Sequence, residues 1–137
     1  MARRILVVDD EKDMLFMLQL RLGAAGYEVI TAEDGLDGRA KVLKEKPDLV
    51  LLDVLLPGID GLHLCREIKD NEATLGIPVI ILTASNVQGV EKKCLEAGAN
   101  GYLKKPFDSL ALLNKVKFLL GDTDIEGDTG NETRNLQ

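Results

Sequence analysis

Five short apolar runs alternate along the chain with segments that carry apolar residues at helical spacing, and this alternation constrains the fold most strongly. The runs span residues 4–9 (RILVVD), 28–32 (EVITA), 48–53 (DLVLLD), 78–83 (PVIILT) and, more weakly, 101–105 (GYLKK). Strands that alternate with helices indicate βαβ units, in which consecutive strands are parallel. The pattern therefore predicts an α/β fold, with a five-stranded parallel sheet covered by helices on both faces.

The polarity of the five runs indicates their order in the sheet. The first, third and fourth runs are almost entirely apolar, as expected of central strands that are buried on both faces. The second and fifth runs are more polar and are better suited to the edges. With right-handed crossovers, this ranking favours the doubly wound, flavodoxin-like strand order 2-1-3-4-5.

The segments between the runs predict five helices, because their apolar residues recur every three or four positions. These residues are Met14, Leu15, Leu18 and Leu22 in the first segment, Leu36, Ala40 and Leu43 in the second, Leu62, Cys65 and Ile68 in the third, Val90, Cys94 and Ala97 in the fourth, and Leu110, Leu113, Val116 and Leu120 in the fifth. Pro47 stops the second helix, and Asp108 is the expected N-cap of the fifth.

The composition bounds the class of protein. The chain has 137 residues, enough for one sizeable core, and its formal net charge is −6, so direct binding to nucleic acid is not expected. Cys65 and Cys94 lie in helical segments without CxxC spacing, which indicates reduced thiols. The N-terminal apolar run is too short for a signal peptide, and no run is long enough to span a membrane. We therefore expect a soluble, cytoplasmic protein.

The hydrophobic pattern stops after residue 120. The last 17 residues contain five acids and one arginine, which places a charge of −4 there and leaves −2 on the body. We expect one folded domain over residues 1–120 and a disordered acidic tail or linker over residues 121–137. Part of the tail resembles a calcium-binding EF-hand loop, but Thr133 stands where a bidentate acid is required and no exit helix follows.

Polar side chains follow four of the predicted strands. Asp9 and Asp10 come after the first strand, Asp53 ends the third, Thr83 ends the fourth and Lys105 ends the fifth. In an open parallel sheet, ligands bind beyond the carboxyl ends of the strands, where the strand order reverses. That point lies between the first and third strands here. Because neighbouring strands are about 4.8 Å apart, we expect these side chains to converge on one site.

The residue types at this edge point to phosphoryl chemistry with a metal ion. Clustered carboxylates repel one another unless a cation joins them, and Mg²⁺ takes one or two carboxylates together with a phosphate oxygen. Asp53, at the end of the most buried strand, is the candidate nucleophile toward phosphorus. Asp10 would hold the metal, with Asp9 as a direct or water-mediated helper. Lys105 would neutralise the phosphate oxygens, and Thr83 would donate a hydrogen bond to them.

Four motifs at these positions resemble those of bacterial response-regulator receiver domains. They are LVVDDE (6–11), LLDVLLPGIDG (51–61), VIILTAS (79–85) and GANGYLKKPF (98–107), and the resemblance covers residues 3–120. It implies a single receiver domain, like a chemotaxis regulator, that accepts a phosphoryl group on Asp53. The donor would be a sensor histidine kinase, a phosphotransfer protein or a small phosphodonor. Mg²⁺ would be held by Asp10, Asp53 and the main-chain carbonyl of Leu55.

The resemblance also implies a switch. Thr83 would move to hydrogen-bond the phosphoryl group, and the ring of Tyr102 would swing inward. The face made by the fourth helix, fifth strand and fifth helix would then change shape for a downstream protein or effector domain, or for a phosphorylation-dependent dimer. Such a domain is a signalling switch that catalyses only its own phosphorylation and dephosphorylation. Gly89, near the start of the fourth helix, either softens that helix, where glycine costs about 1 kcal/mol relative to alanine, or is merely tolerated.

Two further positions bear on the lifetime of the phosphorylated state. Leu55 and Ser85 resemble the variable positions that flank the attacking water in this family. Leu55 cannot orient a water molecule and Ser85 is short, so we expect slow hydrolysis of the acyl phosphate. The single histidine, His63, lies away from the acidic edge and is expected to be a solvated helix residue.

A phosphatase of the haloacid dehalogenase type is the alternative function, because such enzymes also form an aspartyl phosphate on a parallel sheet. That class needs D-x-D-x-T or D-x-D-x-V at the first strand, whereas the chain has D-x-D only at residues 122–124. Nucleotide binding lacks both a P-loop and a G-x-G-x-x-G motif. The sequence leaves open whether the domain stands alone or is a fragment of a longer regulator.

Overall fold

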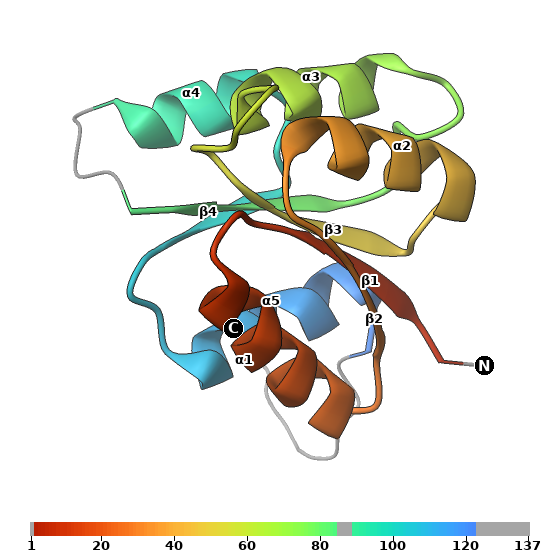
Figure 1. Ribbon diagram of the computed structural model, residues 1–137, viewed down its shortest axis with the longest axis vertical. Helices are drawn as coiled ribbons and strands as arrows, with labels where there is room; N and C mark the ends of the chain where they lie inside the picture. Colours follow the sequence, from red (N-terminus) through yellow and green to blue (C-terminus); the bar gives the residue numbers. More distant parts are fainter. Residues whose placement is uncertain (1, 85–88, 123–137) are drawn as a thin grey trace.

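The computed structural model describes residues 2–84 and 89–122, and these residues form five strands and five helices in strict alternation (Figure 1). The elements are β1 (Arg4–Val8), α1 (Lys12–Ala24), β2 (Glu28–Ala32), α2 (Gly35–Glu45), β3 (Leu49–Asp53), α3 (Gly61–Asp70), β4 (Val79–Thr83), α4 (Val90–Glu96), β5 (Gly101–Lys104) and α5 (Ser109–Leu120). Each strand agrees with its predicted run to within one residue at either end. The predictions for Ser85 and for the tail from residue 123 onward lie outside the described residues.

The five strands form one parallel sheet in the order β2-β1-β3-β4-β5, which confirms the predicted topology. Every residue of β3 and β4 is buried, and so is all of β1 after Arg4. The edge strands β2 and β5 are mostly half-buried. The ranking of strands by polarity therefore reflected their true burial.

Alternate residues of the central strands point into two separate cores. One core packs α2, α3 and α4 against the sheet, and α1 and α5 form the other on the opposite face (Figure 1). On β3, Val50 and Leu52 enter the first core, whereas Leu49 and Leu51 enter the second. Full burial of such a side chain stabilises the fold by about 1.5–3 kcal/mol, so both faces hold the sheet rigid.

Aspartate caps set the starts of three helices. The Asp108 carboxylate accepts from the main-chain N–H of Leu110, which confirms the expected cap of α5. Asp60 caps α3 in the same way, through the N–H of Leu62. Asp34 caps α2. Each cap satisfies a main-chain donor that the helix itself leaves free.

Helix α2 is where the sequence pattern and the observed packing differ. The apolar spacing of Leu36, Ala40 and Leu43 predicted the helix correctly, but all three residues are exposed. Its buried residues are Gly35, Gly38 and Val42. A Cβ on Gly38 would lie 3.0 Å from a Val8 methyl group, so only a residue without a side chain fits this close to the sheet.

Two other details of the fold refine the sequence analysis. Gly89 lies at the start of the fourth helix as predicted, but it precedes α4 as the N-cap, with φ of 91°, so the cost of glycine within a helix does not apply to it. Cys65 and Cys94 are free and lie in the same buried cluster, where burial raises the pKa of the Cys65 thiol to about 11. Among the described residues, no helix is long and apolar enough to cross a membrane.

Candidate active site at the carboxyl edge of the sheet

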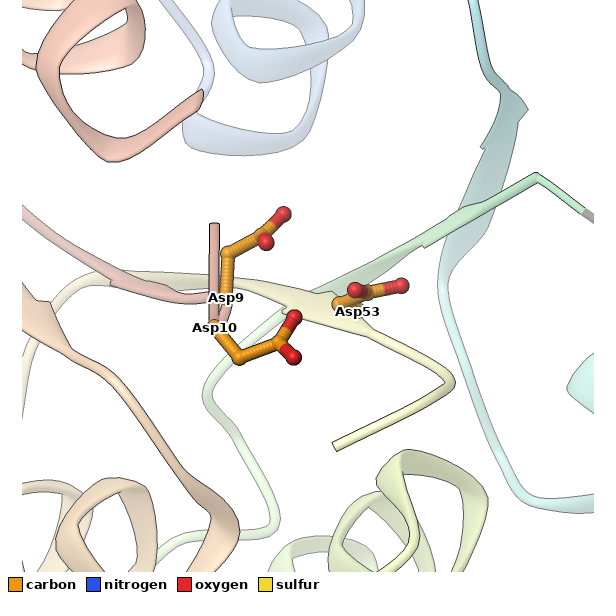
Figure 2. A group of neighbouring side chains, drawn as sticks. All are labelled: Asp9, Asp10 and Asp53. Atoms are coloured by element: carbon orange, nitrogen blue, oxygen red, sulfur yellow. The ribbon is translucent and has the colours of Figure 1, made fainter. Parts of the chain in front are cut away.

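Three aspartates meet where β1 and β3 end. One carboxylate oxygen from each of Asp9, Asp10 and Asp53 lies within 4.8 Å of the others (Figure 2). Asp9 and Asp10 follow directly after β1, and Asp53 is the last residue of β3. The two strands are neighbours in the sheet, so the convergence expected at the strand-order reversal is present.

The start of α3 packs directly against the strand end that carries Asp53. The main-chain N–H of Gly61 donates to the carbonyl of Val54 at 2.9 Å. A Cβ at Gly61 would lie 2.9 Å from the carbonyl carbon of Asp53 and from Cα of Val54, and closer still to the Asp53 carbonyl oxygen. Glycine at this position therefore lets α3 approach closely and holds the main chain of Asp53 in place.

Lys105 forms ion pairs with the acidic group. Its Nζ lies 3.0 Å from Asp9 Oδ2, 3.5 Å from Asp53 Oδ2 and 3.5 Å from Glu11 Oε1. Only 11% of the lysine side chain is exposed. Its main-chain N–H donates to the Thr83 carbonyl at 2.7 Å, and the Lys105–Pro106 peptide bond is cis. The ammonium group is therefore held inside the site rather than extended into solvent.

The two charged partners respond differently to this environment. Burial raises the pKa of the Asp53 carboxyl, and the nearby Asp9 charge adds to this, while Lys105 and the main-chain N–H of Leu55 oppose it without cancelling it. Burial lowers the pKa of Lys105, but its hydrogen bond to Asp9 and the charges of Asp53, Asp9 and Glu11 outweigh this and raise it. The Lys105 ammonium group thus stays charged, but its charge does not fully offset the effect of burial on the pKa of Asp53.

Asp9 and Asp10 differ sharply although they are adjacent in sequence. Asp9 is fully buried, and its two carboxylate oxygens accept from the Glu11 main-chain N–H at 2.9 Å and from Lys105. Asp10 is exposed and makes no hydrogen bond or ion pair with the described part of the chain. Its oxygens are therefore the ones available to a further ligand.

The other predicted residues lie around this group. Thr83 is buried at the end of β4, beside the strand of Asp53. Leu55 is 74% exposed, and its main-chain N–H hydrogen-bonds the Asp53 carboxylate. Tyr102 is half-buried on β5 against the core of α2, α3 and α4. A hydrogen bond with Glu91 of α4 raises the pKa of the Tyr102 hydroxyl.

Two residues that contact the predicted site residues, Glu11 and Glu91, were not identified from the sequence. Glu11 belongs to the acidic motif after β1, so its proximity to Lys105 could have been anticipated from that motif. Glu91 carries no such signal, because its contact with Tyr102 depends on how α4 packs against β5. His63, by contrast, lies on α3, is 60% exposed and pairs with Glu67 at 2.9 Å, as expected of a solvated helix residue.

Comparison with known proteins identifies the family. A family model described as the response regulator receiver domain matches residues 5–117. The chain belongs to this family. The receiver domain is 43% identical over 119 residues to the response regulator PleD of Caulobacter vibrioides, covering 87% of the chain and 26% of PleD. It is also 40% identical over 125 residues to the regulatory protein PhoP of Bacillus subtilis, covering 91% of the chain and 51% of PhoP. The chain thus spans about a quarter and a half of these relatives.

A solved structure shows the same fold with a metal bound. The receiver domain of sensor histidine kinase PA1611 from Pseudomonas aeruginosa is described with a magnesium ion coordinated in its active-site cleft. It is 33% identical to this receiver domain with a TM-score of 0.81, covering 88% of this chain and 99% of that one. Receiver domains are the phosphorylation-activated switches of two-component signalling, acting between histidine kinases and effector domains. The comparisons give no support to the haloacid dehalogenase alternative.

Proposed function

We propose that Asp53 is the residue of this receiver domain that becomes phosphorylated. The observation that carries the proposal is the position of Lys105, whose buried ammonium group lies within 3.5 Å of both Asp9 and Asp53. Burial together with the neighbouring acid raises the pKa of Asp53, and the Lys105 ammonium group beside it can offset the negative charge that a phosphoryl group would bring. A carboxylate held beside a fixed cation is the arrangement that accepts a phosphoryl group.

The transfer is a displacement at phosphorus. An Asp53 carboxylate oxygen forms the new O–P bond while the bond from phosphorus to the donor breaks, and the donor leaves with that electron pair. The donor atom is an imidazole nitrogen for a phosphohistidine and an oxygen for acetyl phosphate. Lys105 neutralises charge on the phosphoryl oxygens, and Thr83 donates its hydroxyl to one of them.

A magnesium ion fits the residues at this edge. Three carboxylates from two neighbouring strands supply hard oxygen donors, and Asp10 has no competing partner among the described residues. Asp10, Asp53 and the main-chain carbonyl of Leu55 would hold the ion, with Asp9 as helper. When bound, the ion would neutralise negative charge on the carboxylates and on the incoming phosphoryl group.

The conformational change on phosphorylation would pass from the site to Thr83 and Tyr102. Thr83 ends β4, and the side chain of Tyr102 on the adjacent β5 contacts Glu91 of α4. A change at Thr83 would therefore reach the face made by α4, β5 and α5, where a downstream protein, an effector domain or a second phosphorylated copy would bind. The input partner would be a sensor histidine kinase or a phosphotransfer protein.

Labelling with a small phosphodonor tests the acceptor. The wild type, incubated with radiolabelled acetyl phosphate and Mg²⁺, should take up one alkali-labile phosphate per chain. Asp53→Asn should take up none. Asp70→Asn is the matched control, because Asp70 is an exposed aspartate on α3 without any hydrogen bond or ion pair to the described residues. Label retained by Asp53→Asn would assign the acceptor elsewhere and refute the proposal.

Partner capture tests the switch. Beryllofluoride mimics an acyl phosphate, so immobilised protein with and without it should retain different partners from a lysate. The difference should vanish in Asp53→Asn. Identical partners in both states would refute the switch while leaving the acceptor assignment intact.

A further inference from the structure

Helix α2 carries an apolar stripe on its outer face that nothing in the described chain covers. Leu36 is 58% exposed, Leu43 is 47% exposed, and Ala40 between them is exposed as well. We propose that this stripe is a docking surface for a second copy of the same chain, with the two α2 helices antiparallel across a two-fold axis. This surface is separate from the face of α4, β5 and α5.

The spacing of the stripe is that of a helix–helix seam. Positions 36, 40 and 43 are separated by four and then three residues, as the d, a and d positions of a coiled coil are. Ala40, at the centre, lets two helix axes approach closely. In an antiparallel pair, each Leu36 meets Leu43 of the second copy, so the contact is self-complementary and closes as a dimer.

The charges that flank the seam favour the antiparallel orientation. Asp37 and Lys44 both occupy e positions, and antiparallel helices bring e positions of the two copies together. Each Asp37 then faces Lys44 of the second copy, twice by symmetry. A parallel pair would instead bring e positions next to g positions, so Asp37 would not face Lys44 of the second copy. Lys44 makes no ion pair with any described residue, so it is free for this contact.

The side-chain contacts that α2 already makes do not compete with contacts to a second copy. Among the described residues, the Asp37 carboxylate pairs only with Lys41, at 3.2 Å between two partly exposed side chains, which is a weak interaction in water. Arg39 is fixed by two hydrogen bonds to Glu67 at 2.8 and 2.6 Å, which keeps it beside α3 and off the seam. A rigid, preformed surface loses little conformational entropy on association.

The β3–α3 loop borders the stripe without covering it. The main-chain N–H of Gly35 donates to the Pro57 carbonyl at 3.1 Å, which anchors the start of α2 on that loop. Gly58 of this loop lies beside Leu36: a Cβ built on Gly58 would stand 3.6 Å from the Leu36 Cγ. Because Gly58 has no side chain, it leaves Leu36 uncovered. A seam of two helical turns is small, so we expect a weak dimer that forms at high protein concentration.

Sedimentation velocity on the full chain, without phosphodonor or Mg²⁺, tests the proposal by charge exchange. The wild type should shift from monomer to dimer as concentration rises. Lys44→Glu should raise the dissociation constant about tenfold, because two attractive contacts become repulsive. Asp37→Lys with Lys44→Glu should restore the wild-type value, because the opposed charges are merely exchanged. The cap of α2 survives these changes, because it uses the main-chain N–H of Asp37.

An apolar substitution pair separates this surface from others. Leu43→Glu should abolish the dimer, whereas Leu95→Glu, at a leucine of α4 that is 61% exposed, should leave it unchanged. Thermal unfolding of each variant verifies that it is folded. A wild type that remains monomeric, a double charge variant that stays as weak as Lys44→Glu, or a dimer lost only in Leu95→Glu would each overturn the proposal.

Discussion

Replacement of Gly61 by alanine should destabilise the receiver domain and displace Asp53. Gly61 is the first residue of α3, and its backbone has no positive φ, so alanine can adopt the conformation. The conflict is purely one of space. The added Cβ would stand 2.9 Å from the carbonyl carbon of Asp53 and from Cα of Val54.

The structure sets the size of the effect. Non-bonded carbon atoms rest about 3.5–4.0 Å apart, and the Asp53 carbonyl oxygen lies closer to the added Cβ than either carbon, so the backbone of β3 or α3 must move by about 1 Å or more. Overpacking of this kind costs about 1–3 kcal/mol, and the upper end applies here because the opposing atoms are main chain rather than a flexible side chain. A loss of about 3 kcal/mol lowers the unfolding temperature of a domain of this size by roughly 10 °C.

Two assays measure the two consequences. Urea denaturation followed by circular dichroism gives the loss of unfolding free energy. The rate of labelling by acetyl phosphate reports the displacement of Asp53 and should fall by roughly tenfold or more, because a misplacement of 1 Å can cost about 10²-fold in rate. Gly23→Ala is the matched control: its Cβ would meet nothing within 4 Å, and alanine in a helix gains up to about 1 kcal/mol over glycine. Wild-type stability and labelling rate in Gly61→Ala would refute the reasoning.

Four further substitutions or treatments test other parts of the molecule. Lys105→Met strips the buried Asp9 carboxylate of its cation and should cost on the order of 3 kcal/mol of unfolding free energy, measured by urea denaturation. Leu55→Asn places an amide beside the site and should shorten the lifetime of the aspartyl phosphate, measured as loss of radiolabel. Cys65, whose pKa burial raises to about 11, should resist iodoacetamide at neutral pH until the chain is unfolded, measured by mass spectrometry. Gly89→Ala should lower the unfolding free energy by about 1 kcal/mol, because φ of 91° disfavours a side chain.

Each of these expectations has a contradicting result. A Lys105 variant as stable as the wild type would mean that the main-chain hydrogen bond to Asp9 is sufficient for that carboxylate. Equal rates of label loss from Leu55→Asn and the wild type would show that residue 55 does not control hydrolysis of the aspartyl phosphate. Modification of Cys65 in the native protein would show that α3 opens readily. A Gly89→Ala variant more stable than the wild type would show that residue 89 does not need a positive φ.

The strand order was predictable because burial on two faces leaves an unmistakable trace in sequence. A central parallel strand has apolar residues at every position, as Leu49 to Leu52 do, whereas an edge strand such as β2 includes polar residues. The group of Asp9, Asp10, Asp53 and Lys105 followed from the topology alone, because the carboxyl ends of neighbouring strands must meet. The hydrophobic pattern and the strand topology were therefore enough for these two predictions.

Contacts that depend on side-chain direction could not be predicted in this way. Asp9 and Asp10 are consecutive and chemically identical, yet one is fully buried on Lys105 and the other faces solvent. Only the way the chain turns after β1 distinguishes them. The contact between Tyr102 and Glu91 likewise depends on the placement of α4, which the apolar spacing of its residues does not determine.

The buried face of α2 shows how packing distance overrides hydrophobic pattern. A helix usually turns its largest apolar residues toward the sheet, but α2 lies so close to β1 that a Cβ on Gly38 would stand only 3.0 Å from a Val8 methyl group. A leucine cannot enter the space between α2 and Val8, so Gly38 occupies it, and Leu36 and Leu43 lie on the exposed face. The exposed half of each leucine adds nothing to the stability of the monomer, and a second molecule that covered it would bury that remaining apolar surface. The same close approach that shapes the core therefore creates the surface on which we expect the second copy to dock.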